Sequence, residues 1–202
     1  MKTNQQHKLK SSSTACQCYT DLQLIYYPKL TLNSNLFKIF KQTLAWQAEH
    51  LRIYGKVVKV PRQVAWYGDA NAIYRYSGVD HQPHPWTNEL LEVKHCIENK
   101  LGCDFNSVLA NYYHDGNDYM GWHADNEKEL GQQPLIASLS LGATRSFVLK
   151  HKQNGNKIKF YLADRSLLLM RGKTQAYWLH SLPKIKNALG ARINLTFRKI
   201  LA

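Results

Sequence analysis

Three side chains of this 202-residue sequence have the types and spacing of a metal site. His123 and Asp125 stand two positions apart, so in an extended segment they point the same way and can bind one ion together. His180, 55 positions beyond Asp125, can complete the set from a distant strand. Two histidines and one carboxylate leave three positions open, which non-haem iron(II) oxygenases use for a chelating co-substrate and O₂. Because the chain has nine histidines, a hydrogen-bonded surface His/Asp pair is the competing interpretation.

A second set of polar side chains lies near the C-terminus, where apolar and polar residues alternate strictly over 192–198. As a strand, this segment carries Ile193, Leu195 and Phe197 on one face and Arg192, Asn194, Thr196 and Arg198 on the other. If the polar face meets solvent, this is an ordinary half-buried strand. If it lines a cavity, two buried guanidinium groups require an anion, and a dicarboxylate fits because arginine can hold a carboxylate by two parallel hydrogen bonds. Twelve positions separate His180 from Arg192, which is enough for one turn between adjacent strands.

Two helices are expected beside these strands. Over 34–50, Ser34 can cap a helix whose apolar stripe consists of Leu36, Phe37, Phe40 and Leu44. Over 88–101, Thr87 can cap a second helix, Gly102 ends it, and its apolar face consists of Leu90, Val93, Ile97 and Leu101.

Short β-rich segments separated by turn residues predict the remaining elements. Strands are expected over 108–113, 135–142, 146–152, 157–162, 166–172 and 191–200. Early helices followed by many antiparallel strands predict an α+β fold, with helices packed on the outside of a β-sandwich or jelly roll. The length fits one domain, so we expect a flexible polar tail over 1–20 and a single domain over 21–202.

The distribution of charge favours a nucleic-acid partner. The net charge is +13, and it comes from the two ends of the chain. Residues 1–62 hold ten Lys or Arg against two Asp or Glu, residues 63–149 hold five against eleven, and residues 150–202 hold twelve against one. A basic surface of this size favours a phosphate backbone or an anionic membrane. No basic amphipathic helix supports the membrane, and a merely soluble basic protein is the remaining alternative.

The distribution of apolar residues and the spacing of the cysteines indicate where in the cell the protein is expected. No uncharged apolar run approaches the ~18 residues that a membrane span needs. The N-terminus lacks the apolar stretch of a secretory signal. The four cysteines, Cys16, Cys18, Cys96 and Cys103, lack zinc-type spacing and are interpreted as reduced thiols. We therefore expect an intracellular protein, cytoplasmic in a bacterium or nuclear in a eukaryote.

From about residue 50 to 202 the chain resembles the AlkB family of iron(II)- and 2-oxoglutarate-dependent nucleic-acid dealkylases, and most of all its duplex-DNA-acting branch. The motifs that carry the resemblance are PRQVAWYGD, YRYSG, Asn111-Tyr112-Tyr113, WHADNE, SLSLGATRSF, HSLP and ARINLTFRKI, in that order. The resemblance implies a double-stranded β-helix, or jelly roll, with N-terminal helices outside it. It places a nucleotide-recognition region at about 50–80 and the catalytic jelly roll at about 105–202.

The resemblance also implies roles for individual residues. The implied iron ligands are His123, Asp125 and His180, which are also implied to be catalytic together with Arg198. The implied contacts of 2-oxoglutarate are Asn111, Tyr113, Arg192, Asn194, Thr196 and Arg198. Among these, Arg192 is implied to bind the distal carboxylate. The implied contacts of the damaged base are Tyr74, Tyr76 and Ser77, with Glu127 near its exocyclic amine. Tyr54 is implied to be an aromatic finger that faces the DNA, where the duplex-acting branch has phenylalanine. Arg62 is implied to lie on the same DNA-facing element as Tyr54. Simpler interpretations are core aromatics for the tyrosine pair, hairpin packing for Tyr54 and a solvated acid for Glu127.

The implied function is oxidative demethylation of bases such as 1-methyladenine and 3-methylcytosine in single- or double-stranded DNA. Iron(II) is the implied cofactor, and 2-oxoglutarate and O₂ are the implied co-substrates, with formaldehyde, succinate and CO₂ as products. A monomer that binds no membrane is expected. Two alternatives stay open: the same chemistry on RNA or on a protein side chain, and a nucleic-acid-binding module without catalysis.

Overall fold

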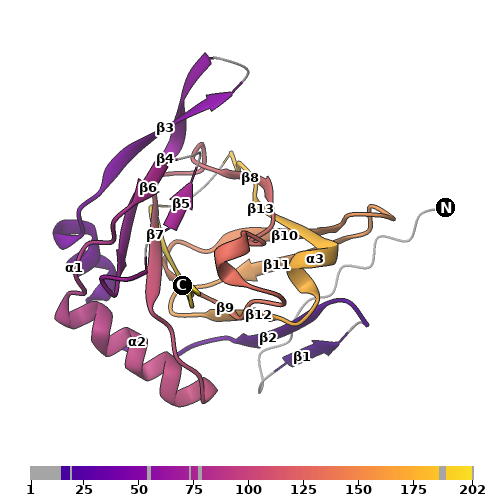
Figure 1. Cartoon of the computed structure of the whole chain (residues 1–202), viewed down its shortest axis with the longest axis horizontal. Helices are drawn as coiled ribbons and strands as arrows, with labels where there is room; N and C mark the ends of the chain where they lie inside the picture. The colour runs from indigo at the N-terminus through magenta and orange to yellow at the C-terminus, as the bar shows by residue number, and fades with distance from the viewer. Residues whose placement is uncertain are drawn as a thin grey trace.

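Two antiparallel sheets dominate the computed structural model (Figure 1). The structure describes residues 15–18, 20–53, 56–72, 74–76, 79–186 and 190–201, and within these it describes only the backbone of 15–18, 49–53, 56–59, 74–76 and 79–81. In the larger sheet the strands lie in the order β1 (Ala15–Cys18), β2 (Gln23–Tyr27), β12 (Leu167–Arg171), β9 (Ile136–Gly142), β14 (Arg192–Arg198), β7 (Ser107–Tyr113), β4 (Lys56–Gly68) and β3 (Gln47–Ile53). In the smaller sheet the order is β11 (Lys157–Leu162), β10 (Arg145–His151), β13 (Trp178–Leu182) and β8 (Met120–His123). A separate hairpin joins β5 (Tyr74–Tyr76) to β6 (Val79–His81).

The strands from β7 to β14 pair as a jelly roll. Going inward from both ends of this segment, β7 pairs with β14, β8 with β13, β9 with β12 and β10 with β11. The first and third of these pairs belong to the larger sheet, and the second and fourth belong to the smaller one. One long double ribbon is thus rolled into two facing sheets, which confirms the predicted α+β fold with a double-stranded β-helix core.

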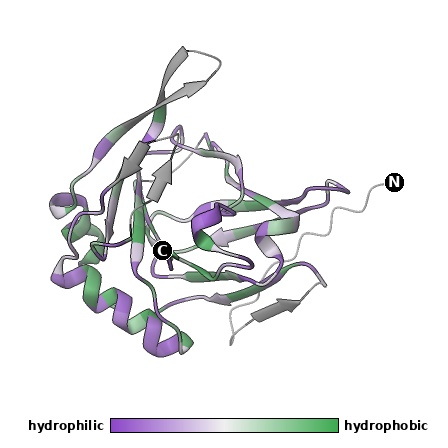
Figure 2. Cartoon of the chain, viewed as in Figure 1, coloured by the Kyte–Doolittle hydropathy of each residue, from purple (hydrophilic) through white to green (hydrophobic). Residues whose placement is uncertain are grey.

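The helices cover the outer face of the larger sheet, as predicted. Figure 1 shows α1 (Leu36–Thr43) and α2 (Asn88–Leu101) on the same side of it, and Figure 2 shows apolar and polar residues on different sides of α2. Buried side chains of both helices share one core with the outward-facing residues of β7, β9 and β14. These are Leu36, Phe40, Leu90, Val93 and Ile97 from the helices and Val108, Ala110, Leu139, Leu195 and Phe197 from the strands. Two shorter elements are η1 (Lys128–Leu130) and α3 (Thr174–Tyr177).

One of the two predicted helices is confirmed in full, and the other is shorter than predicted. In α2 the bounds and both ends are confirmed, because the Thr87 hydroxyl accepts the Leu90 N–H at 3.2 Å and Gly102 takes the left-handed conformation at φ +65°. The helix expected over 34–50 is only α1. Its N-cap is Asn35 rather than Ser34, with no side-chain cap bond, and Leu44 turns to ψ 145°. Residues 47–53 instead form β3, because pairing with the long strand β4 overrides their local helical pattern.

All six predicted strands are present, as β7, β9, β10, β11, β12 and β14. One expectation about their arrangement was wrong: β13 and β14 are not adjacent, because they belong to opposite sheets. The backbone of β1 lies within the segment expected to be a polar tail and pairs with β2, while residues 1–14 lie outside the described part of the chain, so the bounds of the tail stay a prediction. Within the described residues, no helix is long and apolar enough to cross a membrane.

The cap of α2 gives a first test of these local assignments. Replacing Thr87 with alanine removes the acceptor of the Leu90 N–H, so we expect the free energy of unfolding to fall by about 1 kcal/mol in chemical denaturation. Thr43→Ala is the control, because the Thr43 hydroxyl only donates to the exposed Ile39 carbonyl near the end of α1. Its effect should stay within about 0.5 kcal/mol. Equal losses in both variants would show that the cap is not the cause.

Candidate metal and co-substrate site

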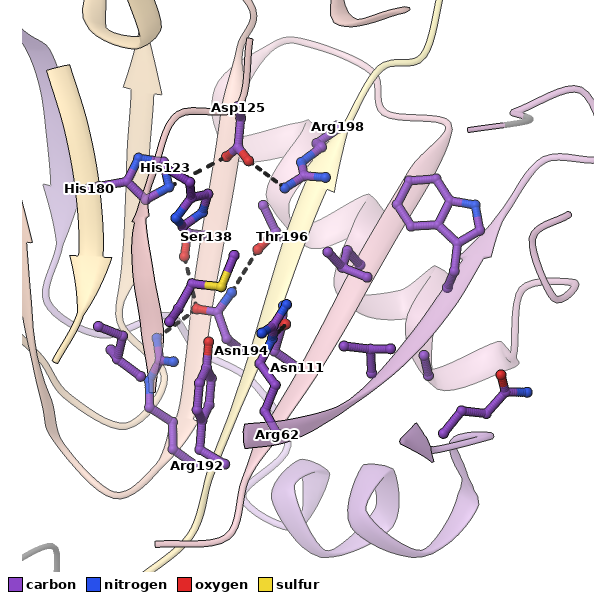
Figure 3. A pocket seen from close by; sticks show the side chains of 18 of the residues that line it. Arg62, Asn111, His123, Asp125, Ser138, His180, Arg192, Asn194, Thr196 and Arg198 are labelled. Atoms are coloured by element: carbon purple, nitrogen blue, oxygen red, sulfur yellow. Dashed lines mark hydrogen bonds and ion pairs between the residues drawn. The ribbon is translucent and has the colours of Figure 1, made fainter. Parts of the chain in front are cut away.

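A cavity of about 600 Å³ opens between the two sheets. The larger sheet lines it with side chains of β3, β4, β7, β9, β12 and β14, and the smaller sheet with side chains of β8, β10 and β13. Figure 3 shows two groups of polar side chains in it: His123, Asp125 and His180 at one end, and Arg192 at the other. The cavity thus brings together the two sets of residues that the sequence analysis identified separately.

The three predicted metal ligands converge. His123 of β8 and His180 of β13 are register partners in the smaller sheet, and their ring centroids lie 4.1 Å apart. Asp125 follows β8 at a spacing of two residues, and its Oδ2 lies 3.8 Å from Nε2 of His180. One ligand atom from each of the three residues lies within 4.8 Å of the other two. This is the facial set of two histidines and one carboxylate that suits iron(II).

The protonation of these groups suits metal binding. Burial lowers the pKa of His180 to about 3, with a further contribution from His123, so its ring is neutral at neutral pH. Nδ1 of His123 lies 2.9 Å from the Gly121 carbonyl oxygen. A proton on Nδ1 would be donated to that carbonyl, leaving the Nε2 lone pair for an ion.

Arg198 keeps the third ligand ionised. Burial raises the pKa of the Asp125 carboxyl group, but the positive charge of Arg198 is the largest of the opposing contributions, and the net pKa lies below its ordinary value. The Arg198 Nη2 donates to Asp125 Oδ1 at 2.7 Å, and both side chains are buried. One carboxylate oxygen is thereby held by arginine, while Oδ2 faces His180.

The alternating strand lines the cavity, as the second of its two interpretations requires. The polar residues of β14 face the interior, and a chain of hydrogen bonds joins the first three of them (Figure 3). Arg192 Nη2 donates to Asn194 Oδ1 at 2.6 Å, and Asn194 Nδ2 donates to Thr196 Oγ1 at 2.7 Å. Asn194 Oδ1 also accepts from Ser138 Oγ at 3.0 Å. The network fixes the orientation of the Arg192 guanidinium.

Arg192 is a buried cation whose partners are neutral. It is 2 % exposed, and its Nη2 donates hydrogen bonds to Asn194 Oδ1 and, at 2.9 Å, to Ser140 Oγ. Among the described residues, no carboxylate pairs with it and its Nε has no hydrogen-bond partner. Burial lowers the pKa of Arg192 to about 10, so the group stays charged at neutral pH. A buried, charged guanidinium requires an anion, and the distal carboxylate of 2-oxoglutarate meets this need.

The other predicted co-substrate contacts lie on the neighbouring strand. Tyr113 of β7 is the register partner of Arg192, and its ring centroid lies 5.4 Å from the guanidinium carbon. Asn111 is the register partner of Asn194, and both side chains line the cavity. Strand pairing therefore brings the Asn111/Tyr113 pair and the Arg192/Asn194 pair together on one wall.

The predicted substrate residues are only partly visible. Arg62 lies in the cavity wall rather than on an outer surface: it is 7 % exposed, and its Nε donates to Asn111 Oδ1 at 2.6 Å. Glu127 also lines the cavity. The backbones of Tyr74 and Tyr76 form β5, but their side chains are not described, and Tyr54 and Ser77 lie outside the described residues.

Four further residues of the site were missed in the sequence. Ser138 and Ser140 project inward from β9, and their alternation with apolar residues could have indicated this. Arg145 is 1 % exposed and donates to the carbonyls of Asp115, Asp118 and Pro183 at 2.8 to 2.9 Å. Gln175 accepts the backbone N–H of Asp125 at 3.0 Å. No spacing in the sequence signals the last two contacts.

Comparisons with known proteins agree with this geometry. Residues 23–198 match the family model described as 2OG-Fe(II) oxygenase superfamily. The chain is 43% identical over 159 residues to the human "DNA oxidative demethylase ALKBH2", covering 75% of this chain and 61% of that protein. It is also 43% identical over 150 residues to the rat "Alpha-ketoglutarate-dependent dioxygenase alkB homolog 3", covering 69% of this chain and 50% of that protein. The chain thus spans between half and two thirds of the length of these relatives.

A solved structure shows the same fold at lower sequence identity. The structure of OsALKBH1 superposes with a TM-score of 0.63 and 18% identity, over 87% of this chain and 97% of that one. The family match itself runs from β2 to the end of β14 and includes the described residues that carry the three metal ligands and Arg192. On these grounds the chain belongs to the 2OG-Fe(II) oxygenase superfamily.

Proposed function

We propose that this protein is an iron(II)- and 2-oxoglutarate-dependent dioxygenase that removes methyl groups from N-alkylated bases, such as 1-methyladenine and 3-methylcytosine, in DNA. The observation that carries the proposal is that one cavity holds both the His123/Asp125/His180 set and the buried Arg192, whose charge is not matched by a carboxylate in the described residues. The names of relatives that are DNA oxidative demethylases support the choice of substrate. An intracellular monomer is part of the same proposal.

Five charged or metal-binding side chains of the cavity have distinct tasks in this reaction. The two histidines and Asp125 hold the ion, Arg192 binds the distal carboxylate of 2-oxoglutarate, and Arg198 keeps Asp125 ionised. Iron(II) with 2-oxoglutarate and O₂ supplies the oxidising power to hydroxylate an N-alkyl carbon, after which formaldehyde leaves. The protein's own contribution is to orient both substrates and to keep water out of a largely buried site.

The cavity also suits a damaged base. Glu127 lines it, and a carboxylate favours a cationic lesion such as 1-methyladenine over the neutral normal base. The base must leave its stack, which costs a few kcal/mol and less where the lesion already weakens pairing. Tyr54, which follows β3 in the sequence, is proposed as the finger that fills the gap, and Tyr74, Tyr76 and Ser77 as contacts of the base. The basic ends of the chain suit the phosphate backbone.

A direct assay tests the proposal. The protein is incubated with iron(II), ascorbate and 2-oxoglutarate on oligonucleotides that contain 1-methyladenine, as single-stranded DNA, duplex DNA and RNA, and formaldehyde is measured. We expect release from DNA. Release from RNA alone would support the RNA alternative, and succinate formation that depends only on an added protein would support the protein-side-chain alternative.

The metal ligand gives the next prediction. Asp125→Ala removes one of three ligands, so we expect demethylation to fall below detection while affinity for methylated DNA, measured by fluorescence anisotropy, changes little. The variant frees Arg198 from its ion pair, so near-native thermal unfolding has to be verified first. Retained turnover in a folded variant would refute the iron assignment.

The anion-binding residue gives a third prediction. Arg192→Met keeps much of the side-chain volume but removes the charge, so we expect the KM for 2-oxoglutarate to rise at least about 30-fold, which corresponds to about 2 kcal/mol. The control is 2-oxobutanoate, a keto acid without the distal carboxylate. Wild type and variant should use 2-oxobutanoate equally poorly. A variant that loses as much activity with 2-oxobutanoate as with 2-oxoglutarate would indicate a folding defect.

The finger gives a fourth prediction. Tyr54→Ala removes the stacking surface, so we expect demethylation of duplex DNA to slow about tenfold, because stacking contributes on the order of 1–3 kcal/mol per base. Demethylation of the same lesion in a single strand should change much less, since there is no gap to fill. Tyr54→Phe should behave as wild type on both substrates. Equal losses on both substrates in the alanine variant would exclude the finger role.

A further inference from the structure

Asp125 lies outside the paired strands that position His123 and His180. His123 ends β8, and residues 124–127 have no regular secondary structure, whereas His180 sits within β13. Asp125 is nevertheless only 3 % exposed, so its backbone N–H needs a partner within the protein. That partner is the side-chain oxygen Oε1 of Gln175, at 3.0 Å and 50 positions along the chain.

Gln175 is itself fixed in one orientation. Its side chain is 1 % exposed, and its Nε2 donates to Sδ of Met170 at 3.5 Å, which leaves Oε1 directed at Asp125. A buried glutamine with both ends of its amide engaged has little freedom to rotate. The backbone of Asp125 is therefore held by an immobile acceptor.

The short helix α3 that carries Gln175 is anchored to two strands and to the residue that follows a third. The Thr174 hydroxyl accepts the backbone N–H of Gln23 in β2 at 2.9 Å and donates to the carbonyl of Arg171 in β12 at 2.7 Å. Lys152, directly after β10, donates from its Nζ to the carbonyl of Gln175 at 2.9 Å. The position of the Gln175 side chain is thus set by both sheets.

We propose that Gln175 is a positioning residue of the iron site: by accepting the Asp125 N–H, it holds the carboxylate where Oδ2 can share an ion with the two histidines. This inference rests on the iron site described above. Without the acceptor, a buried N–H is left unsatisfied and the loop over 124–127 has to shift to satisfy it, which moves the carboxylate away from the histidines. Outer-sphere partners of metal ligands typically contribute about 10- to 100-fold in metal affinity.

Metal affinity, rather than turnover, is the measurement. Co²⁺ serves as an air-stable probe, titrated into the metal-free full-length protein by calorimetry. Gln175→Leu has a similar volume but no acceptor, and we expect it to bind Co²⁺ about tenfold more weakly than wild type. Gln175→Glu keeps an oxygen at the position of Oε1, and its affinity should not fall. If the leucine variant does not fold, Gln175→Asn, whose shorter side chain cannot reach the Asp125 N–H, replaces it with the same expectation.

A matched control separates positioning from general loss of stability. Ser166→Ala also deletes a buried side-chain bond, from Oγ to the Ala163 carbonyl at 2.7 Å, but that bond does not touch the metal ligands. This variant should keep wild-type Co²⁺ affinity even where its melting temperature falls as much as that of Gln175→Leu.

Each other outcome has a distinct meaning. Wild-type affinity in Gln175→Leu, or equal losses in the leucine and glutamate variants, would overturn the role of Gln175. A wild-type protein that does not bind Co²⁺ would overturn the iron site itself. A wild-type protein that binds Co²⁺ but does not demethylate DNA would overturn only the proposed substrate, and the comparison among variants would still stand.

Discussion

The inward-facing arginines of β14 are the constraint on which the rest of the site depends. The strand lies between β9 and β7 in the larger sheet, its apolar face packs under the helices, and its polar face must therefore point between the sheets. Two guanidinium groups in such a place are costly unless nearby negative charge compensates them. For Arg198 the partner is Asp125, which belongs to the protein. For Arg192 the described residues supply none, so the interior reaches electrostatic balance only when a ligand brings a carboxylate.

The jelly roll explains why residues far apart in the sequence form one site. Because the second strand of the double ribbon pairs with the second from last, His123 and His180 become neighbours across a single strand pair. Because the first strand pairs with the last, Asn111 and Tyr113 meet the polar face of β14. The two pairs belong to opposite sheets, so the ion and the anion site face one another across the cavity instead of lying side by side on one surface.

Periodicity predicted those parts of the molecule in which local pattern and burial agree. The alternation over 192–198 and the capped helix over 88–101 are such cases, and both are found as expected. Elements fixed by long-range pairing were not predictable: β3 looked like the continuation of a helix, and its partner β4 was missed altogether. Alternation along β14 also could not show which sheet lies next to it, so the expected adjacency to the strand of His180 was wrong. The contact of Gln175 with Asp125 joins a four-residue helix to a segment without regular secondary structure, so no periodic pattern in the sequence predicts it.

The position of Arg192 has a consequence for the end of the catalytic cycle. This arginine would hold the carboxylate that the reaction leaves unchanged, since succinate retains the distal carboxylate of 2-oxoglutarate. Arg192 would therefore bind succinate as well as 2-oxoglutarate, because the two differ only at the keto acid end. Replacement of succinate by 2-oxoglutarate would then depend on the contacts of the keto acid end with the ion. Succinate that accumulates would compete with 2-oxoglutarate for the Arg192 guanidinium.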